Sequence, residues 1–373
     1  MKVLHVYSKY YPNTVGGLQE SIRQIITSTS KRGVENRVFA LDSESPGKYD
    51  YPEVTVYKAK LLFSWASCDF GFVQAFSMFK KLTNWADIVH YHYPWPFADL
   101  MHLMCKNKKP SVMTYHSDVL NKGILGSLYY PLMKKMLNNM DKVIVTSPNY
   151  FQGSKLLATI DPEKMDIIHL GINECTYKND LELSKHVDVY ERFNVRQGEY
   201  VLFIGVPRNY KGLNTLVASG SKILGNVVLA GPTGDEKLFR GFSQPMPNIR
   251  FLGPVTGAEK LALLSGCIGL VLPSDKRSEA FGMVLVEASM MSKPMITCEI
   301  GTGTSFVNKH RETGIVVDPD SEEQLVSAIN MMIEDEEMAC RLGVAARNRY
   351  ESLFAGSKMG SLYVELYEDL LDG

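Results

Sequence analysis

Short apolar runs alternate with longer stretches of helical spacing along most of the chain. The runs predict buried strands at residues 3–7, 37–41, 88–92, 112–115, 143–146 and 166–170, and again at 200–205, 227–230, 249–252, 268–272, 295–298 and 315–317. Between them the pattern is helical or irregular. Because uninterrupted apolar strands that alternate with helices are typical of parallel sheets, the sequence predicts an α/β fold.

A polar, aperiodic stretch divides this pattern in two. Residues 171–196 lack sustained periodicity, and a new strand, loop and helix begin at Tyr200. A chain of 373 residues, 45% of them hydrophobic, can bury two cores. We therefore predict an N-terminal domain over residues 1–171 and a C-terminal domain over residues 172–356, both with Rossmann-like architecture.

Two adjacent glycines, Gly16 and Gly17, follow the first predicted strand and precede a helix. This order opens a Rossmann-like unit, but the glycines do not form a G-x-G-x-x-G fingerprint, and no acidic residue suited to a dinucleotide is evident on the next strand. The sequence therefore disfavours a nicotinamide cofactor.

His116 is the candidate functional residue of the first half. It follows the strand predicted at 112–115, and ligands of parallel sheets gather beyond the carboxyl ends of the strands. It is suited to hydrogen-bond a sugar hydroxyl or an acceptor; the alternative is a histidine satisfied by backbone groups. For His90, His92 and His102 the structural interpretation is favoured, and no metal is assigned to them.

Aromatic residues concentrate at 61–82 and 91–97. The first of these stretches includes Phe63 and Trp65 and ends near Lys80 and Lys81, so contact with a membrane interface or a lipid-linked acceptor is one interpretation. Packing against the sheet is the favoured one.

The stretch from residue 268 to 288 is the strongest candidate for a binding site. It predicts a strand, a polar loop and a helix that begins at Met283, with Gly282 at the junction. Gly282 lets a ligand approach the backbone closely, and the unpaired N–H groups of a first helical turn attract an anion. A diphosphate is expected there, unless Gly282 is merely a turn residue.

Two glutamates flank this junction. Glu287 lies inside the helix, roughly 7–8 Å from its start at about 1.5 Å per residue, which matches the reach from a β-phosphate to a ribose. A carboxylate can accept two hydrogen bonds from a vicinal diol, and Glu279 on the loop would face the group beyond the diphosphate. The alternative is that both are ordinary surface acids.

Two cations, Arg208 and Lys211, follow the strand predicted at 200–205. At the carboxyl end of a strand they suit a diphosphate. As solvated surface charges they would have no functional meaning.

Net charge, cysteine spacing and the lack of long apolar runs argue against several classes of protein. The 40 basic and 41 acidic residues nearly cancel, so nothing indicates a nucleic-acid-binding protein. The six cysteines show no zinc-binding spacing, and there is no signal-peptide pattern at the start and no apolar run of 18 residues. We expect a cytoplasmic protein with free thiols, with peripheral association with the inner membrane as an alternative.

Taken together, Gly16-Gly17, His116, Arg208 with Lys211, and Glu279-x7-Glu287 with Phe281-Gly282 resemble the pattern of glycosyltransferase family 4, over nearly the whole chain. The paired glutamates are the most specific part. The resemblance implies a GT-B fold, in which two Rossmann-like domains face each other across a cleft and the last helix returns to the first domain. The amphipathic segment 357–371 fits that returning helix, whose apolar face is Met359, Leu362, Tyr363, Leu366, Tyr367 and Leu370.

The resemblance also implies residue roles and a reaction. Lys211 and the backbone at Gly282 and Met283 would hold the diphosphate, Glu287 the ribose and Glu279 the donor sugar. His116 would lie at the sugar near the reaction centre, with Phe281 in the donor site, and Gly16 and Gly17 would admit donor phosphate or acceptor. The implied reaction retains the anomeric configuration, and we expect no metal because Asp318-Pro319-Asp320 is predicted to be a turn.

The chain departs from the family pattern at two places. The family commonly has arginine directly after the glycine that corresponds to Gly205, whereas this chain has Val206 there and a cation only at Arg208. Residues 299–306 replace the two glycines and glutamate of many members. That run and residues 91–97 look most like mannosyl- and rhamnosyltransferases of bacterial O-antigen assembly, which implies GDP-mannose as donor and a lipid-linked saccharide as acceptor.

Other functions stay open on the sequence. The donor could instead be GDP-rhamnose or a UDP-sugar. A protein that binds a nucleotide sugar without turnover, an epimerase or a phosphorylase would share much of the pattern, whereas no pair of flanking carboxylates supports a hydrolase.

Overall fold

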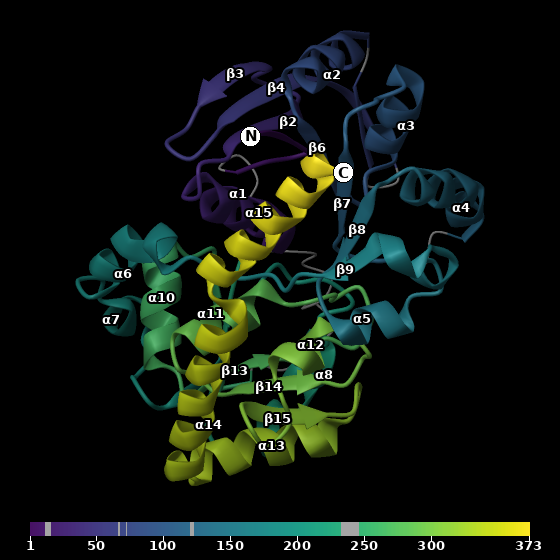
Figure 1. Cartoon of the computed structure of the whole chain (residues 1–373). Helices are drawn as coiled ribbons and strands as arrows, with labels where there is room; N and C mark the ends of the chain where they lie inside the picture. The colour runs from purple at the N-terminus through teal and green to yellow at the C-terminus, as the bar shows by residue number, and fades with distance from the viewer. Residues whose placement is uncertain (12–15, 66–67, 72, 120–122, 233–245) are drawn as a thin grey trace. The chain divides into compact units, whose positions relative to one another are not determined.

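The computed structural model describes residues 1–11, 16–65, 68–71, 73–119, 123–232 and 246–373. The chain divides into two compact units, one formed by Met1–Gly171 with Gly356–Gly373 and the other by Ile172–Ala355. Each is built on its own sheet (Figure 1).

The sheet of the first unit has the strand order β3-β4-β2-β1-β6-β7-β8-β9, with β5 paired to β4. Neighbours from β4 to β9 are parallel, whereas β3 and β5 run antiparallel to β4. The strands are β1 (Lys2–Val6), β2 (Glu35–Asp42), β3 (Gly47–Asp50), β4 (Thr55–Trp65), β5 (Cys68–Gly71), β6 (Ile88–Tyr93), β7 (Ser111–Tyr115), β8 (Lys142–Val145) and β9 (Met165–Ile167). The helices are α1 (Gly17–Ser30), α2 (Val73–Trp85), α3 (Pro96–Cys105), α4 (Gly123–Asn138), α5 (Pro148–Gly153) and α15 (Gly356–Asp372).

The sequence pattern predicts no strand between residues 41 and 88, and this prediction was wrong, because β3, β4 and β5 lie there. β4 is a long strand beside β2, and it turns back into β5. Its pattern is concealed because Lys58, only 2% exposed, lies within it and pairs with Asp42 at 3.0 Å. A buried lysine breaks the apolar run that strand recognition relies on, and its cost in burial is offset here by the carboxylate partner.

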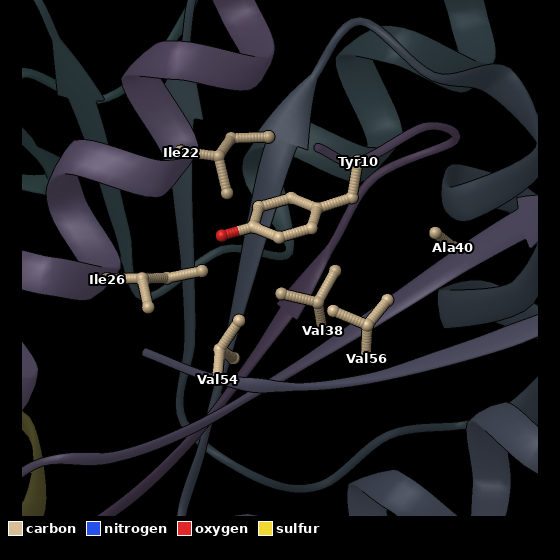
Figure 2. Close-up of a cluster of buried hydrophobic side chains, with 7 residues drawn as sticks. All are labelled: Tyr10, Ile22, Ile26, Val38, Ala40, Val54 and Val56. Carbon is tan, nitrogen blue, oxygen red and sulfur yellow. The ribbon is translucent and has the colours of Figure 1, made fainter. Parts of the chain in front are cut away.

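The core of the first unit forms where α1 packs on the sheet. Figure 2 shows a buried cluster in which the Tyr10 ring lies among apolar side chains of α1 and of the sheet; its members are Tyr10, Ile22, Ile26, Val38, Ala40, Val54 and Val56. The helix residues in this cluster recur at helical spacing, and those of the strands alternate, as burial of one face requires.

The last helix, α15, belongs to the first unit and lies beside α1 (Figure 1). The two helices approach closely at Gly360, where a Cβ atom would lie 2.7 Å from the Ser28 carbonyl oxygen. Arg32 also donates hydrogen bonds to Ser361 and to the Ser357 carbonyl. The buried face includes Met359, Tyr363, Leu366 and Tyr367, whereas Leu362 is exposed, contrary to the sequence prediction.

The second unit has a parallel six-stranded sheet with the order β12-β11-β10-β13-β14-β15. The strands are β10 (Tyr200–Ile204), β11 (Asn226–Ala230), β12 (Ile249–Gly253), β13 (Gly269–Leu272), β14 (Met295–Cys298) and β15 (Gly314–Val317). The helices are α6 (Lys178–Ser184), α7 (Val189–Phe193), α8 (Leu213–Ala218), α10 (Gly257–Gly266), α11 (Met283–Met290), α12 (Gly303–Val307), α13 (Glu322–Glu334) and α14 (Glu336–Arg349), the last followed by a π-helical turn at Tyr350–Phe354.

The parallel strands of both sheets have the doubly wound order of a Rossmann fold. Counting the parallel strands of each unit from its first, the order is 3-2-1-4-5-6-7 in the first unit and 3-2-1-4-5-6 in the second, and it reverses between β1 and β6 and between β10 and β13. Ligands of such sheets bind outside the carboxyl ends of the strands at this point of reversal. Ligands are therefore expected at the loops after β1, β6, β10 and β13.

In the part of the chain that the structure describes, no helix has the length and apolar character to cross a membrane. All six cysteines are free thiols.

Candidate functional site

In the second unit, the loops that follow β10 and β13 meet at close range. Gly212 has a φ of +64°, and a Cβ atom there would lie 1.8 Å from the carbonyl oxygen of Pro273. The N–H of Asp275 donates to the Tyr210 carbonyl at 3.0 Å. Glycine is therefore required at 212 for both its backbone angle and the contact, which brings Lys211 beside the second loop.

Lys211 and Glu279 form an ion pair across these two loops. Ser274 donates a hydrogen bond to the same carboxylate oxygen, Oε2, at 3.2 Å. Burial acts to lower the pKa of Lys211, but the Glu279 carboxylate and Tyr210 together outweigh it and the pKa is raised, so the ammonium stays charged. Both residues were predicted separately from the sequence, whereas the contact between them was not.

The Gly282 junction has the predicted order of strand, loop and helix: β13 ends at Leu272, and the loop that follows it leads into α11. Gly282 has a φ of +81° and directly precedes α11, which begins at Met283. A first helical turn presents unpaired N–H groups at this point. The Phe281 ring is buried against Phe354, with 6.0 Å between ring centroids, and the Met283 side chain is buried too. Any contact of these two residues with a ligand would therefore use their backbone.

Glu287 is the fifth residue of α11 and is buried. Its Oε1 accepts hydrogen bonds from the Tyr177 hydroxyl at 2.7 Å and from the Lys260 ammonium at 2.6 Å. Among the described residues, Oε2 has no partner. The carboxylate is thus held in place through one oxygen while the second stays available as an acceptor.

Tyr177 and Lys260 were not among the site residues predicted from the sequence. Tyr177 is 110 positions from Glu287 and lies in a segment without periodicity. Lys260 lies on α10, most of whose residues are buried, and its partner Glu287 is 27 positions away. No local signal could have identified either residue, because their relevance comes from a contact made across the fold.

Arg208 is exposed and lies on the turn that leads to Lys211. The backbone N–H of Lys211 donates a hydrogen bond to the Arg208 carbonyl at 2.9 Å. Its side chain has no ion pair among the described residues. The structure therefore places Arg208 next to Lys211 in the same loop but not in the Lys211–Glu279 contact.

In the first unit, Gly16 and Gly17 lie where the chain enters α1. Gly16 is the N-cap in an extended conformation, and a Cβ atom there would lie 2.8 Å from the Gln19 side chain, whereas Gly17 is exposed with open space around it. Residues 12–15 of the predicted glycine loop lie outside the described residues.

His116 directly follows β7 and is buried. Its backbone N–H donates to the Tyr93 carbonyl at 3.2 Å, and its ring Nε2 lies 3.0 Å from Nδ1 of His92. Burial lowers its pKa to about 3, so the ring is neutral at physiological pH.

Three further buried histidines lie close together on adjacent strands. Nitrogens of His5, His90 and His92 lie within 4.8 Å of one another, which is the one candidate group for a metal among the described residues. The His90 nitrogens lie 2.6 Å from the Tyr367 hydroxyl and 2.7 Å from the Thr114 hydroxyl, and His5 lies 3.0 Å from His92. Hydrogen bonds inside the protein thus occupy these nitrogens.

His102 and the Asp-Pro-Asp motif have local partners. His102 lies 2.9 Å from the Tyr91 hydroxyl. Asp318 accepts a hydrogen bond from Gln324 at 2.8 Å, and Pro319 and Asp320 form a turn, as the sequence predicted.

The predicted site residues are divided between the two units. Lys211, Glu279, Gly282 and Glu287 lie on the loops after β10 and β13 and on α11, at the point where the strand order reverses. An ammonium beside the start of a helix suits an anionic ligand, and a fixed carboxylate suits hydroxyl groups. His116 and the glycine pair lie after strands of the first unit.

Comparisons with known proteins give consistent results. Residues 15–174 match the family profile "Glycosyltransferase Family 4", and residues 191–349 match "Glycosyl transferases group 1". The chain is 38% identical to D-rhamnosyltransferase WbpZ of Pseudomonas aeruginosa, over 95% of this chain and 92% of that one. It is 35% identical to O-antigen chain mannosyltransferase C of Escherichia coli, over 100% of this chain and 99% of that one.

The fold also matches solved structures. Sucrose-phosphate synthase from Thermosynechococcus elongatus superimposes with a TM-score of 0.78 at 21% identity, over 100% of this chain and 99% of that one. At this identity the likeness concerns the fold.

Proposed function

Because the chain belongs to glycosyltransferase family 4 and has the GT-B fold, we propose that it is a retaining transferase that moves mannose from GDP-mannose onto a lipid-linked saccharide during O-antigen assembly. Transfer of a sugar follows from the family. The donor, acceptor and stereochemistry are the proposed part.

The observation that carries the proposal is the Lys211–Glu279 pair beside the N-terminus of α11. During transfer, negative charge develops on the departing nucleoside diphosphate. A preplaced ammonium and helix N–H groups aimed at that charge stabilise the transition state more than the ground state. Lys211 is the proposed diphosphate ligand, assisted by the backbone at Gly282 and Met283, while Glu279 orients Lys211 and contacts the donor sugar.

Glu287 is the proposed ribose ligand. Support comes from its position one helical turn inside α11 and from the Tyr177 and Lys260 contacts that fix its carboxylate. With Oε1 held by the protein, Oε2 can accept a hydrogen bond from a ribose hydroxyl. Arg208, exposed on the Lys211 loop, is proposed to add positive charge near the diphosphate in place of the arginine that many family members have at the position of Val206.

We further propose that no divalent metal takes part. The cation set of Lys211 and Arg208 supports this, because it supplies the charge that a metal would otherwise bring to the diphosphate. Departure of the diphosphate and attack by the acceptor on the same face of the sugar would retain the anomeric configuration, with the leaving phosphate taking the acceptor's proton.

The choice of donor rests on the relatives. One is named a D-rhamnosyltransferase and another a mannosyltransferase. Rhamnose lacks the C6 hydroxyl of mannose. A site that forms a hydrogen bond with a substrate hydroxyl strongly rejects an analogue without that hydroxyl. GDP-mannose is the proposed donor, GDP-rhamnose the first rival and a UDP-sugar the second.

A lipid-linked acceptor would bring the protein to a membrane surface. Support comes from the hairpin of β4 and β5, where Leu62, Phe63 and Trp65 are 54%, 51% and 58% exposed. Exposed aromatic residues near lysines suit the interfacial region of an anionic bilayer. We propose peripheral association through this hairpin.

A donor panel tests the function. The protein is incubated with a lipid-linked saccharide and, separately, with GDP-mannose, GDP-rhamnose and UDP-glucose, with and without a chelator. We expect an α-mannosylated product from GDP-mannose, undiminished by the chelator. A preference for GDP-rhamnose would correct the donor, and loss of activity with the chelator would overturn metal independence.

The same panel separates the rival classes. Binding of a donor without any product would indicate a nucleotide-sugar-binding protein. Conversion of a donor in the absence of acceptor would indicate an epimerase, and dependence on inorganic phosphate would indicate a phosphorylase.

A further inference from the structure

A continuous chain of hydrogen bonds runs through the buried interior of the first unit and ends at His116. Asn36 Oδ1 lies 3.0 Å from Nε2 of His5, Nδ1 of His5 lies 3.0 Å from Nε2 of His92, and Nδ1 of His92 lies 3.0 Å from Nε2 of His116. The four residues come from β2, β1, β6 and the end of β7, which are neighbours in this order in the sheet. The chain therefore leads to the carboxyl edge, where ligands of such sheets bind.

The orientation of the Asn36 amide sets the direction of this chain. Its Nδ2 faces the carbonyl oxygens of Ile26 and Val34 at 3.4 and 3.3 Å, and the hydroxyls of Thr29 and Ser30 at 3.1 and 2.8 Å. Carbonyl oxygens only accept hydrogen bonds, so the NH2 group must point at them. The oxygen of Asn36 therefore points at His5 and can only accept.

Each neutral imidazole has one N–H and one nitrogen lone pair. Fixing the acceptor at the Asn36 end therefore determines the tautomer of every histidine in the chain. His5 donates from Nε2 to Asn36, which leaves Nδ1 as an acceptor for His92 Nε2–H. Nδ1 of His92 is then an acceptor for Nε2–H of His116. The rings are neutral because burial lowers the pKa of His5 to about 4 and of His116 to about 3, and that of His92 well below its ordinary value.

We propose that Asn36, His5 and His92 are positioning residues that hold His116 in its Nε2–H tautomer, so that Nδ1 is an obligatory acceptor for a hydroxyl group of a sugar substrate. Within the described part of the chain, Nδ1 of His116 has no protein partner. This role at the sugar rests on the proposed function; the tautomer assignment does not.

The order of donors decides what the site recognises. A hydroxyl donates to the Nδ1 lone pair without any proton rearrangement, whereas a substrate group that can only accept, such as a carbonyl or an ether oxygen, finds no N–H there. The relay thus favours a hydroxyl-bearing sugar over an analogue in which that hydroxyl is removed or methylated.

The tautomers are measured directly on protein labelled with ¹⁵N in its histidines, through two- and three-bond ¹H–¹⁵N correlations near pH 7.5. Replacement of single histidines assigns the signals. We expect neutral Nε2–H rings at His5, His92 and His116. A neutral Nδ1–H ring or a charged ring at His116 in the unaltered protein would overturn the proposal without reference to any variant.

Asn36→Leu and Asn36→Asp test the fixed end. Leucine removes the acceptor, so His116 should populate both tautomers; aspartate in its protonated form keeps an acceptor beside His5 and an O–H donor for the Ile26 or Val34 carbonyl, and should keep the Nε2–H tautomer. Asn308→Leu is the matched control, because Asn308 is likewise buried and donates to two carbonyl oxygens and a hydroxyl, but in the second unit. An unchanged His116 tautomer in folded Asn36→Leu would overturn the relay.

Turnover links the tautomer to the substrate. If the two tautomers become equally populated, the competent fraction halves, and kcat/KM for the sugar donor and acceptor should fall about twofold in Asn36→Leu and recover in Asn36→Asp. The predicted tautomers in a protein that transfers no sugar would leave the relay intact and remove the proposed function. Stoichiometric zinc in the purified protein, bound through His5, His90 and His92, would overturn the relay.

Discussion

At the scale of single residues, Lys211 shows how the fold brings together two residues that lie far apart in the sequence. It contacts Glu279, which lies 68 positions later in the chain, because Gly212 allows its loop to touch Pro273. The cation and the acid were each recognisable from their place after a strand. Their ion pair, and the Ser274 hydroxyl that joins it, are products of the loop contact.

Replacing Lys211 with alanine should lower turnover by a factor on the order of 10²–10³, because it removes one charge aimed at the departing diphosphate. Steady-state transfer assays with saturating donor measure this. Lys222→Ala is the control, since Lys222 forms an exposed ion pair with Glu322 at 3.1 Å and should leave turnover unchanged. Turnover near the unaltered level in Lys211→Ala would remove Lys211 from the mechanism.

At the scale of elements, the β4–β5 hairpin is the part of the fold where the strand prediction from the hydrophobic pattern was wrong. The aromatic stretch at 61–82 splits into an exposed strand end and the helix α2, in which Phe79 is fully buried. Packing against the sheet, the favoured interpretation, is therefore correct for Phe79 and wrong for Phe63 and Trp65. Strand patterns report which face is buried, and an end that extends beyond the core has no such face.

The double substitution Phe63→Ser with Trp65→Ser should reduce binding to vesicles severalfold, since it removes the exposed apolar surface of the hairpin. Co-sedimentation with vesicles that contain phosphatidylglycerol measures the bound fraction. Leu224→Ser removes a comparably exposed side chain from the second unit, 64% exposed, and should have no effect. Equal binding of the double variant and the unaltered protein would refute association through this hairpin.

At the scale of the whole molecule, neutral histidines are concentrated in the first unit. Burial lowers the pKa of His5 and His102 to about 4 and of His116 to about 3, and lowers those of His90 and His92 well below the ordinary value of 6.5. Asp99 affects the pH dependence of stability in the opposite direction, because burial raises its pKa to about 7.

The sign of the resulting pH dependence follows from proton counts. Below pH 6.5 the unfolded chain protonates these five histidines while the folded unit keeps them neutral, so unfolding takes up protons and stability falls as pH falls from about 6.5 to 4. Asp99 releases a proton on unfolding in that window and offsets one histidine. The net slope is about 1.4 kcal/mol per pH unit for each proton taken up.

Thermal unfolding should therefore begin at a lower temperature at pH 5 than at pH 7.5. Tryptophan fluorescence reports the first unit selectively, because Trp65, Trp85 and Trp95 all lie in it. Replacing the exposed His186 should leave the pH dependence unchanged. A midpoint that is constant or rises towards pH 5 would contradict the assignment of neutral buried histidines.

The sequence by itself determined the α/β class, two Rossmann-like units and most strands, because a strand buried on both faces must be apolar throughout and is visible locally. It also placed Lys211, Glu279, Gly282, Glu287 and His116 after strands or at a helix start, where parallel sheets bind ligands. Tertiary structure alone decided the contacts: Tyr177 and Lys260 on Glu287, the hidden strand around Lys58, and the histidine chain from Asn36 to His116. Such contacts join residues far apart in the chain, and no local pattern encodes a pairing that the strand order creates.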